Sequence, residues 1–307
     1  MCEKPLIETS VVFEEDDHDI IGIWELAWRN FKKNKLAVLG MIIFLFMLML
    51  VLVGPLLSPY GRDAMDLTIA KEAPSFKHWL GTDEFGRDYL TRLMYGGQVS
   101  LKVGLYSTVV SLILGVTLGG VAGYYGGIID NLLMRLGEIV SSFPFMPFAI
   151  TFSAVVGTKV SPENKMYVIM TILGILSYPG LARLIRGQLL SLREQEFMQA
   201  ADALGLSDVR KIFKHLIPNT YAFIIINATL GVAGAILGES ALSYLGFGIV
   251  PPTPSWGNLV VYANNSYTLK NLPWLWIPPG ILILITVVSI NLMGDGLRDA
   301  VDAKSND

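Results

Sequence analysis

The sequence LAVLGMIIFLFMLMLVLVGPLL at residues 36–57 contains no charged side chain. The hydrocarbon core of a bilayer is about 30 Å thick, and roughly 20 apolar helical residues cross it. Inside that core every backbone N–H and C=O group must be paired within the protein, which only helices and closed barrels achieve. The run therefore predicts a membrane-spanning helix, and it places the whole chain among membrane proteins.

The composition predicts more than one such helix. Of the 307 residues, 52% are hydrophobic and 16% are charged, whereas a soluble domain carries about 25% charged residues. Pro144 and Pro147 interrupt the weakest candidate, although a bundle tolerates proline because neighbouring helices satisfy the freed backbone groups. We expect an all-α, polytopic membrane protein with about six transmembrane helices, near residues 36–57, 99–123, 133–157, 166–183, 220–245 and 273–294.

Basic residues near the span ends predict the orientation. The segment RNFKKNK at 29–35 directly precedes the first span, and Lys and Arg favour the cytoplasmic side. Six crossings then place the 196–219 loop and both termini in the cytoplasm. The segment 58–98 falls outside despite its five basic residues, because long loops cross largely regardless of charge. With no disulfide available, that segment must be ordered by packing and turns.

These assignments divide the chain into a cytoplasmic N-terminal segment (1–35), the first transmembrane helix (36–57), an extracytoplasmic segment (58–98), a core of five further helices (99–294) and a cytoplasmic tail (295–307). The first apolar run begins too late for a signal peptide, so we expect it to be retained. Apolar side chains in 19–33 share one helical face, which either lies flat in the lipid headgroup zone or packs on the bundle. They are Ile20, Ile23, Trp24, Ala27, Trp28 and Phe31.

Motifs of the common enzyme classes are absent from the sequence. There is no GxxxxGK[ST] phosphate loop, no HExxH and no GxSxG. Cys2 is the only cysteine, and His18, His78 and His215 are scattered outside the predicted spans. We therefore expect no internal disulfide, no metal site, no cofactor bound by this chain and no enzymatic activity. The net charge of −3 gives no reason to expect nucleic acid as a partner.

Small residues within the spans predict close helix contacts. Gly115, Gly119, Gly123 and Gly127 recur every four residues, a spacing that lets another helix approach closely. A gate hinge is the alternative interpretation.

Polar residues within the spans are few. A charged side chain at mid-bilayer costs about 2.5–3.5 kcal/mol, so it needs a partner or water. Glu239 is the most deeply placed. It either pairs within the bundle or belongs to a transport pathway or gate, for which Ser240 and Asn227 are further candidates.

A water-soluble helix pair, EFMQAADALGLSDVRKIFKHLIPN at 196–219, lies between two predicted spans. Gly205 stands where a helix C-cap favours left-handed backbone, Ser207 can cap the second helix, and Pro218 suits the first turn of the next span. The pair is either a surface hairpin or a docking site for a partner. Its apolar faces hold Phe197, Ala200, Ala201 and Leu204 in the first helix and Val209, Ile212, Phe213, Leu216 and Ile217 in the second, with Arg210, Lys211 and Lys214 opposite.

The stretch QAADALGLSDVRKIFKHLIP resembles the EAA loop of bacterial ABC-importer permeases, with Ala200, Ala201, Gly205 and Pro218 in register. It departs from that pattern at three places, where Gln199, His215 and Ile217 stand for Glu, Ile and Leu. The stretches at 78–101, 239–259 and 294–302 resemble the dipeptide, oligopeptide and nickel branch of these permeases. The segment that includes KKNKLAVLG resembles the subunit type with an additional N-terminal part.

The resemblance implies a type I ABC-importer permease bundle in the inner or plasma membrane of a bacterium or archaeon. Such a bundle forms half of a pathway with a second homologous permease, so the assembly is a hetero-oligomer. Two cytoplasmic ABC ATPase subunits, which bind ATP and Mg²⁺, would dock on coupling helices at 193–218, and an extracytoplasmic substrate-binding protein would deliver the substrate. The implied coupling residues are Gln199, Ala200, Ala201, Leu204, Gly205, Leu206, Ser207, Asp208 and Pro218.

Di- and oligopeptides are the substrates that we expect, since no His or Cys cluster favours a metal path. Nickel or oligosaccharide import within the same family remains an alternative. A self-sufficient secondary transporter is the alternative from another class, and it would need ion-coupling groups within the spans.

Overall fold

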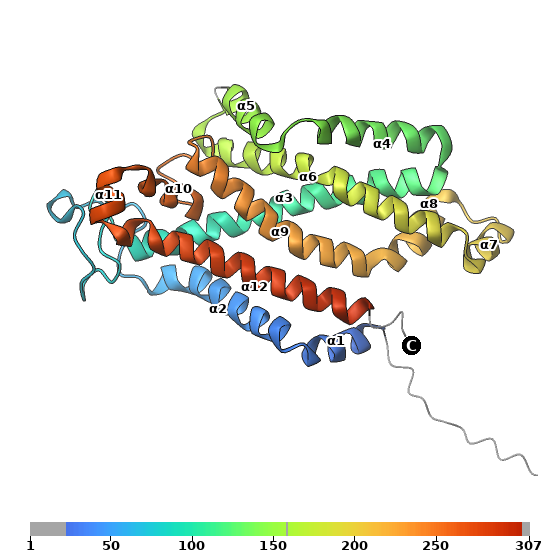
Figure 1. The fold of residues 1–307 in the computed structure, drawn as a ribbon, viewed down its shortest axis with the longest axis horizontal. Coiled ribbons are helices and arrows are strands. Elements are labelled where there is room, and N and C mark those ends of the chain that lie inside the picture. Colours follow the sequence, from blue (N-terminus) through green and yellow to red (C-terminus); the bar gives the residue numbers. More distant parts are fainter. Residues whose placement is uncertain (1–22, 158, 303–307) are drawn as a thin grey trace, which may run out of the picture.

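The computed structural model, which describes residues 23–157 and 159–302, is a bundle of long helices lying side by side (Figure 1). The described part holds no β-strand, only an isolated bridge between Thr82 and Asp88, so the all-α expectation is confirmed. The predictions for Cys2, His18 and residues 303–307 lie outside the described residues. The helices are α1 (Ile23–Lys33), α2 (Lys35–Leu57), α3 (Tyr89–Tyr125), α4 (Gly127–Ser142), α5 (Phe145–Gly157), α6 (Pro162–Arg193), α7 (Glu196–Ala203), α8 (Asp208–Arg210), α9 (Tyr221–Tyr244), α10 (Trp256–Val260), α11 (Ser266–Asn271) and α12 (Ile277–Asp302).

Within residues 23–157 and 159–302, five helical segments are long and apolar enough to cross a bilayer, and each contains most or all of one predicted span. They are Lys35–Leu57, Tyr89–Tyr125, Asn164–Arg193, Asp208–Tyr244 and Pro273–Ala300. The second begins at Tyr89, well before its predicted start at residue 99.

The remaining predicted span, at 133–157, is not a single straight helix. It consists of α4 and α5, which are bent by 85° relative to each other. Phe143 lies between them with φ −80° and ψ 131°, the extended backbone that a residue preceding proline adopts because the proline ring disfavours the helical region. Pro144 therefore breaks this span into two pieces.

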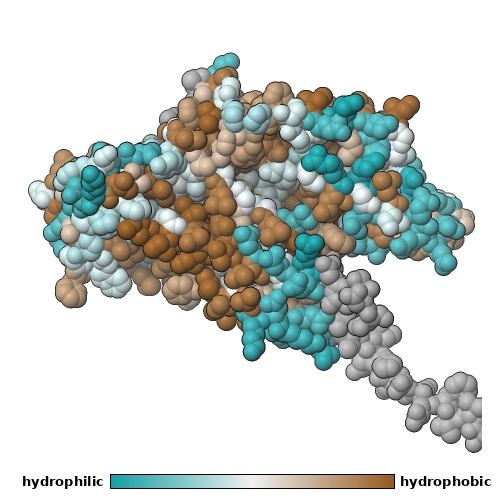
Figure 2. All heavy atoms as spheres, viewed as in Figure 1, coloured by the Kyte–Doolittle hydropathy of each residue, from teal (hydrophilic) through white to brown (hydrophobic). Residues whose placement is uncertain are grey.

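The bundle has an apolar middle and two polar ends. α3 contains 37 residues, so at 1.5 Å per residue it is about 55 Å long and exceeds the hydrocarbon core of a bilayer. Figure 2 shows hydrophobic side chains over the middle of the bundle and hydrophilic ones toward its ends. We name the end that carries α7 and α8 the α7 end, and the opposite end, with α10 and α11, the α10 end (Figure 1).

Glycines let α3 and α6 pack closely. A Cβ placed on Gly115 would lie 2.8 Å from the Leu181 side chain, and one on Gly123 would lie 2.9 Å from the Arg186 carbonyl oxygen. Gly119 faces the same helix, so three glycines of the predicted ladder form a packing surface. Gly127 does not, because its φ is +56°, nothing lies within 4 Å of an added Cβ, and it starts α4.

The segment between α2 and α3 folds over the α10 end through buried polar contacts. The Asp83 carboxylate accepts a hydrogen bond from Arg87 Nε at 2.7 Å and lies 3.5 Å from Arg92 Nε. Nearby, His78 Nδ1 lies 2.9 Å from Asp88 Oδ1. All five side chains are buried. Packing and turns therefore order this segment, as the lack of a disulfide partner predicted.

Helix α1 packs partly on α12. Phe31 is buried in a small cluster that includes Ala300, while Trp28 stays 46% exposed with Lys32 above its ring. The packed-helix alternative thus holds for one face of α1, and a basic and aromatic face remains open. The rest of its predicted apolar face, Ile20, Ile23, Trp24 and Ala27, lies outside the residues whose side chains are described.

Candidate functional site

The predicted helix pair begins with a capped turn at the α7 end. α7 ends at Ala203, and Gly205 has φ +65°. The Leu206 N–H donates to the Ala201 carbonyl oxygen at 3.2 Å, and the Gly205 N–H donates to that of Asp202 at 2.9 Å. These two bonds form a Schellman motif, which favours glycine because its left-handed residue carries no Cβ penalty. The left-handed C-cap predicted at Gly205 is confirmed.

The second helix of the pair is not a separate element. Asp208–Tyr244 forms one continuous helical segment, in which a π-helical turn at Lys211–Leu216 and a 3-10 turn at Ile217–Thr220 connect α8 to α9. Pro218 lies in the 3-10 turn. Ser207 precedes the segment as predicted, but its side chain makes no capping hydrogen bond. The capped turn is therefore joined directly to a membrane-spanning helix.

Three apolar side chains of the α7 end point outward. Leu204 is 77% exposed, Val209 66% and Phe213 51%; we name these three the exposed patch. Exposed apolar side chains that adjoin one another mark binding sites for other proteins, so these three are candidates for a contact with a partner. The single apolar stripe predicted for the second helix is wrong, because Val209 and Phe213 are exposed. The other three members, Ile212, Leu216 and Ile217, are buried.

The remaining predicted coupling residues divide between surface and bundle. Ala201 is 4% exposed and packs inward with Met198, a residue that the prediction missed. Apolar side chains occupy two adjacent faces of this eight-residue helix, so the hydrophobic pattern could not predict which face packs against the bundle. Gln199, Ala200, Gly205 and Ser207 are exposed, and Leu206, Asp208 and Pro218 are half-buried.

Lys211 ties the turn to the bundle. Its Nζ lies 2.6 Å from Asp202 Oδ1 and 3.5 Å from Asp208 Oδ1, and Asp208 accepts a hydrogen bond from the Tyr124 hydroxyl of α3 at 2.7 Å. The Lys211 side chain is 11% exposed and lies at a buried position like Ile212, so its predicted place opposite the apolar side chains is wrong. The i, i+3 spacing of Asp208 and Lys211 could have predicted from the sequence that their side chains are neighbours.

Glu239, predicted for a pathway or gate, lies near the α10 end and holds two elements together. Its Oε1 accepts hydrogen bonds from Ser243 Oγ at 2.5 Å and from Ser255 Oγ at 2.8 Å. Ser255 caps α10 through the Asn258 N–H. Glu239 is completely buried, and its Oε2 has no hydrogen-bond partner among the described residues. These contacts favour the pairing alternative, while a role in the pathway stays a prediction.

Ser240 directly follows Glu239 in α9, and Asn227 lies nearer the start of that helix. Ser240 Oγ donates within its own helix, to the Ile236 carbonyl oxygen at 2.8 Å. Asn227 precedes Glu239 by twelve residues, which is about 18 Å along a helix. The structure therefore does not bring the three predicted pathway residues together.

Asn227 lines a polar pocket of about 250 Å³ between α3, α6 and α9. Ser107, Thr108 and Ser177 also line it. The Thr108 hydroxyl is buried without a hydrogen-bond partner among the described residues, and such a group is usually satisfied by water or a ligand. This pocket thus brings polar side chains of three helices together. Its other lining residues are Ser111, Leu112, Gly180, Leu181, Leu230, Gly231 and Ala235.

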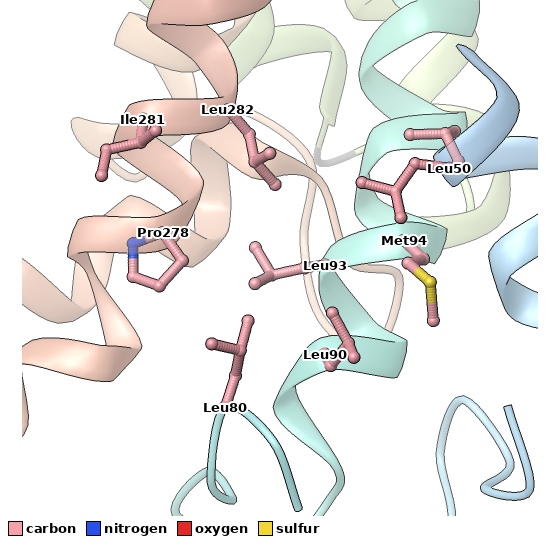
Figure 3. A pocket seen from close by; sticks show the side chains of 9 residues that line it. Leu50, Leu80, Leu90, Leu93, Met94, Pro278, Ile281 and Leu282 are labelled. Carbon is pink, nitrogen blue, oxygen red and sulfur yellow. The ribbon is translucent and has the colours of Figure 1, made fainter. Parts of the chain in front are cut away.

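A second pocket, of about 300 Å³, offers no comparable chemistry. It lies between α2, α3 and α12 under the 58–88 segment, and Leu93, Met94 and Leu282 are among its lining side chains (Figure 3). Every side chain that lines it is apolar, so it cannot hold a polar ligand by hydrogen bonds. Across the described residues, no group of three or more His, Cys, Asp or Glu side chains could bind a metal ion.

Fold and site together define a multi-pass integral membrane protein with a braced, exposed turn at one end and a polar pocket inside. Residues 115–306 match the family described as binding-protein-dependent transport system inner membrane component, and residues 22–74 match the N-terminal transmembrane domain of oligopeptide transport permease C. The chain belongs to this family of inner-membrane transport components, and it is accordingly a permease of the ABC-transporter class.

Its relatives match over nearly their whole length. The dipeptide transport system permease protein DppC of Alkalihalophilus pseudofirmus is 40% identical over 303 residues, which cover 98% of this chain and 97% of the relative. The protein of that name from Bacillus subtilis is 40% identical over 91% of this chain and 85% of its own length. The oligopeptide transport system permease protein OppC of Haemophilus influenzae is 39% identical over 92% and 89%.

Proposed function

We propose that this chain forms half of the transmembrane pathway of an ATP-driven importer for di- and oligopeptides. The observation that carries the proposal is the similarity over 98% of the chain to a permease named for dipeptide transport. The oligopeptide permease of Haemophilus influenzae supports the same substrate class. A second, homologous permease supplies the other half of the pathway.

We place the α7 end in the cytoplasm. Arg29 precedes α2 and Lys35 is its first residue, while Arg193 and Arg210 flank α7; both groups lie at the same end of the bundle (Figure 1). Lys and Arg beside span ends favour the cytoplasmic side. This orientation leaves the α10 end for an extracytoplasmic substrate-binding protein.

In this proposal one of the two ATPase subunits binds the α7 end of this chain at the exposed patch, and the other binds the corresponding helix pair of the second permease. ATP and Mg²⁺ are bound by these partners, which is consistent with the absence of a phosphate loop in this sequence. Because Asp208–Tyr244 is one helical segment, a displacement of the turn moves α9 directly. Lys211 and Asp208 keep the turn attached to α3 during that movement.

The direct test is uptake by purified protein in liposomes. The chain is purified in mild detergent with its co-eluting subunits and inserted into liposomes, with the substrate-binding protein added outside. Uptake of a radiolabelled dipeptide is measured with ATP inside, with a non-hydrolysable ATP analogue inside and without nucleotide. We expect a second permease and two ATPases to co-elute, and uptake only with ATP. Ni²⁺ and a trisaccharide, tested as competitors, are expected to have no effect.

Two outcomes would contradict the proposal. Uptake by this chain alone, driven by an ion gradient, would indicate a secondary transporter. Competition by Ni²⁺ or the trisaccharide, without competition by dipeptides, would indicate an ATP-driven importer whose substrate is not a peptide.

Gly205→Asp tests the docking surface. A Cβ at Gly205 would meet nothing within 4 Å, so the substitution places a charge on the surface without disturbing the packing. We expect the variant to insert normally and to lose ATP-dependent uptake. Measurements are membrane abundance, co-purification of the ATPases and uptake.

Gly205→Asn is the matched control, because Asn and Asp both tolerate left-handed backbone and differ here only in charge. We expect Gly205→Asn to retain much more uptake than Gly205→Asp. Normal uptake by Gly205→Asp would contradict the assignment of this turn to ATPase binding.

A further inference from the structure

Helix α4 carries a stripe of polar side chains that the proposed function does not use. Asn131, Arg135, Glu138 and Ser142 follow each other at i, i+4, i+7 and i+11, a spacing that keeps them on one face of a helix. All four residues are exposed. We name them the polar stripe.

An apolar stripe runs beside it on the same helix. Leu132, Leu136 and Ile139 are 62%, 47% and 51% exposed. They lie one residue further along than members of the polar stripe, or about 100° around the helix axis. The outer surface of α4 therefore has one flank suited to lipid and one that is not.

The polar stripe includes an ion pair that lipid cannot accommodate well. Arg135 Nη1 lies 2.8 Å from Glu138 Oε2, and the two side chains are 76% and 55% exposed. Charged side chains at membrane depth face a bundle interior or a water-filled cavity rather than acyl chains. Figure 2 shows hydrophilic atoms over the region of α4, whereas α2 and α12 present a largely hydrophobic surface.

The contacts of α4 with α6 place Arg135 and Glu138 beside a helix long and apolar enough to cross a bilayer. Asp130 binds Arg186 of α6 through two hydrogen bonds of 2.5 Å, and a Cβ on Gly137 would lie 3.5 Å from Pro179 of the same helix. The two helices are thus antiparallel neighbours, as Figure 1 also shows. Pro179 lies seven residues from Arg186, about 10 Å further into the bundle, and Arg135 and Glu138 flank Gly137 at that level.

The same contacts decide toward which side the polar stripe points. Asn131 and Glu138 each follow an α4 residue that contacts α6, while Gly180 and Gly187 each follow an α6 residue that contacts α4. Each step of one residue along a helix turns the side-chain direction by about 100° around the helix axis, and the sense of the turn is the same in every right-handed helix. In an antiparallel pair, equal rotations away from the contact lead to the same side, so these four residues share one surface.

That surface is open and leads to the polar pocket. A Cβ added to Gly180 or Gly187 would meet nothing within 4 Å. Gly180 also lines the pocket that contains Ser177 and Asn227. The polar stripe, the two glycines and the pocket therefore occupy one side of the bundle.

We propose that the polar stripe of α4 lines the water-filled path of the transported peptide and that Arg135 and Glu138 bind its charged termini. This inference rests on the proposed function. A free peptide carries a carboxylate at one end and an ammonium group at the other, and Arg135 and Glu138 offer one complementary charge to each. Their mutual ion pair keeps both charges paired when no peptide is present.

The first experiment measures water access along both stripes in the assembled transporter. In a Cys2→Ser background, Asn131→Cys and Ser142→Cys report on the polar stripe, and Leu132→Cys and Ile139→Cys are the matched controls. The probe is a membrane-impermeant methanethiosulfonate reagent, which reacts with the thiolate. Because the thiolate forms in water and not in lipid, we expect the polar stripe to react at least about tenfold faster than the controls.

A dipeptide should then protect the polar stripe. With Ser142→Cys as reporter, saturating dialanine is expected to slow the reaction several-fold, and Glu138→Gln in the same chain is expected to raise the peptide concentration needed. Leu136→Ala is the control for that second change and should leave the concentration unaltered. Ser142→Cys and Asn131→Cys keep the ion pair, so they remain informative if Glu138→Gln fails to assemble.

Three results would overturn the inference. Equal reactivity of both stripes would mean that the polar stripe faces no separate aqueous path. Unreactive polar-stripe cysteines in every nucleotide state would mean that the partner permease covers them. Fast reaction with no protection by dialanine, in a complex that transports dialanine, would show that the polar stripe does not contact the peptide. A reactive stripe in a complex that does not import peptides would instead contradict the proposed function alone.

Discussion

At the α10 end, polar side chains from distant segments are buried together, whereas at the α7 end apolar side chains point outward. Asp83 is completely buried and is held by Arg87 and Arg92. Leu204 and Val209, in contrast, are 77% and 66% exposed. Buried polar groups are stable only when their partners are present in the same chain, while exposed apolar groups gain stability when another chain covers them.

The α10 end is thus held together by polar contacts within the chain, although it too exposes large apolar side chains such as Phe76 and Trp79. At the α10 end, Glu239 and Ser255 join α9 to α10 by internal hydrogen bonds. At the α7 end, Lys211 fixes the position of the turn and leaves its tip free. Substitutions should therefore act on stability at the α10 end and on assembly at the α7 end.

The largest effect is expected from Asp83→Ala. Removing Asp83 leaves the buried Arg87 without a carboxylate partner and leaves Arg92 with only Asp63, at 3.3 Å; breaking a buried ion pair in this way costs about 3–5 kcal/mol of the free energy of unfolding. Thermal unfolding of the purified chain in detergent measures the loss. Glu84→Ala is the control, because Glu84 is exposed and should change little. Equal effects of both substitutions would show that the α10 end is not held by this cluster.

An intermediate effect is expected at Glu239. Glu239→Ala removes the acceptor of the Ser243 and Ser255 hydroxyl groups, and unsatisfied buried donors cost about 1–3 kcal/mol. Glu239→Gln keeps an acceptor oxygen, so it should cost less and leave peptide uptake nearly normal. Unfolding and uptake are measured for both variants. A Glu239→Gln variant that is stable but inactive would support the predicted role of Glu239 in the pathway. It would also show that substitutions at the α10 end do not act through stability alone.

The smallest effect on stability is expected from Phe213→Ser. An exposed side chain contributes little to folding, so the free energy of unfolding should change by no more than about 0.5 kcal/mol, while less ATPase should co-purify. Its neighbour Ile212 is 3% exposed, and Ile212→Ser should destabilise the chain itself. Unchanged ATPase recovery with Phe213→Ser would indicate that the exposed patch does not bind the partner.

The sequence by itself determined the helical class, most of the spans and the turn at Gly205. Spans follow from apolar length, because the bilayer thickness sets a minimum that the run 36–57 meets. The turn follows from glycine, because left-handed backbone is costly for residues with a Cβ. Apolar length and the presence of a glycine are both local properties, so a short stretch of sequence is enough to predict the span and the turn.

The tertiary structure alone decided which side chains meet. Lys211 looked like a surface residue until the fold placed Asp202 beside it, and the polar stripe of α4 gained its direction only from the contact of Asp130 with Arg186, 56 residues away. Hydropathy and helical spacing state that a helix has two faces, but not which neighbour each face will contact. The neighbour of each face depends on close packing between segments that are distant in the chain. In such packing, a shift of one residue along a helix can turn a side chain from a neighbouring helix toward open space.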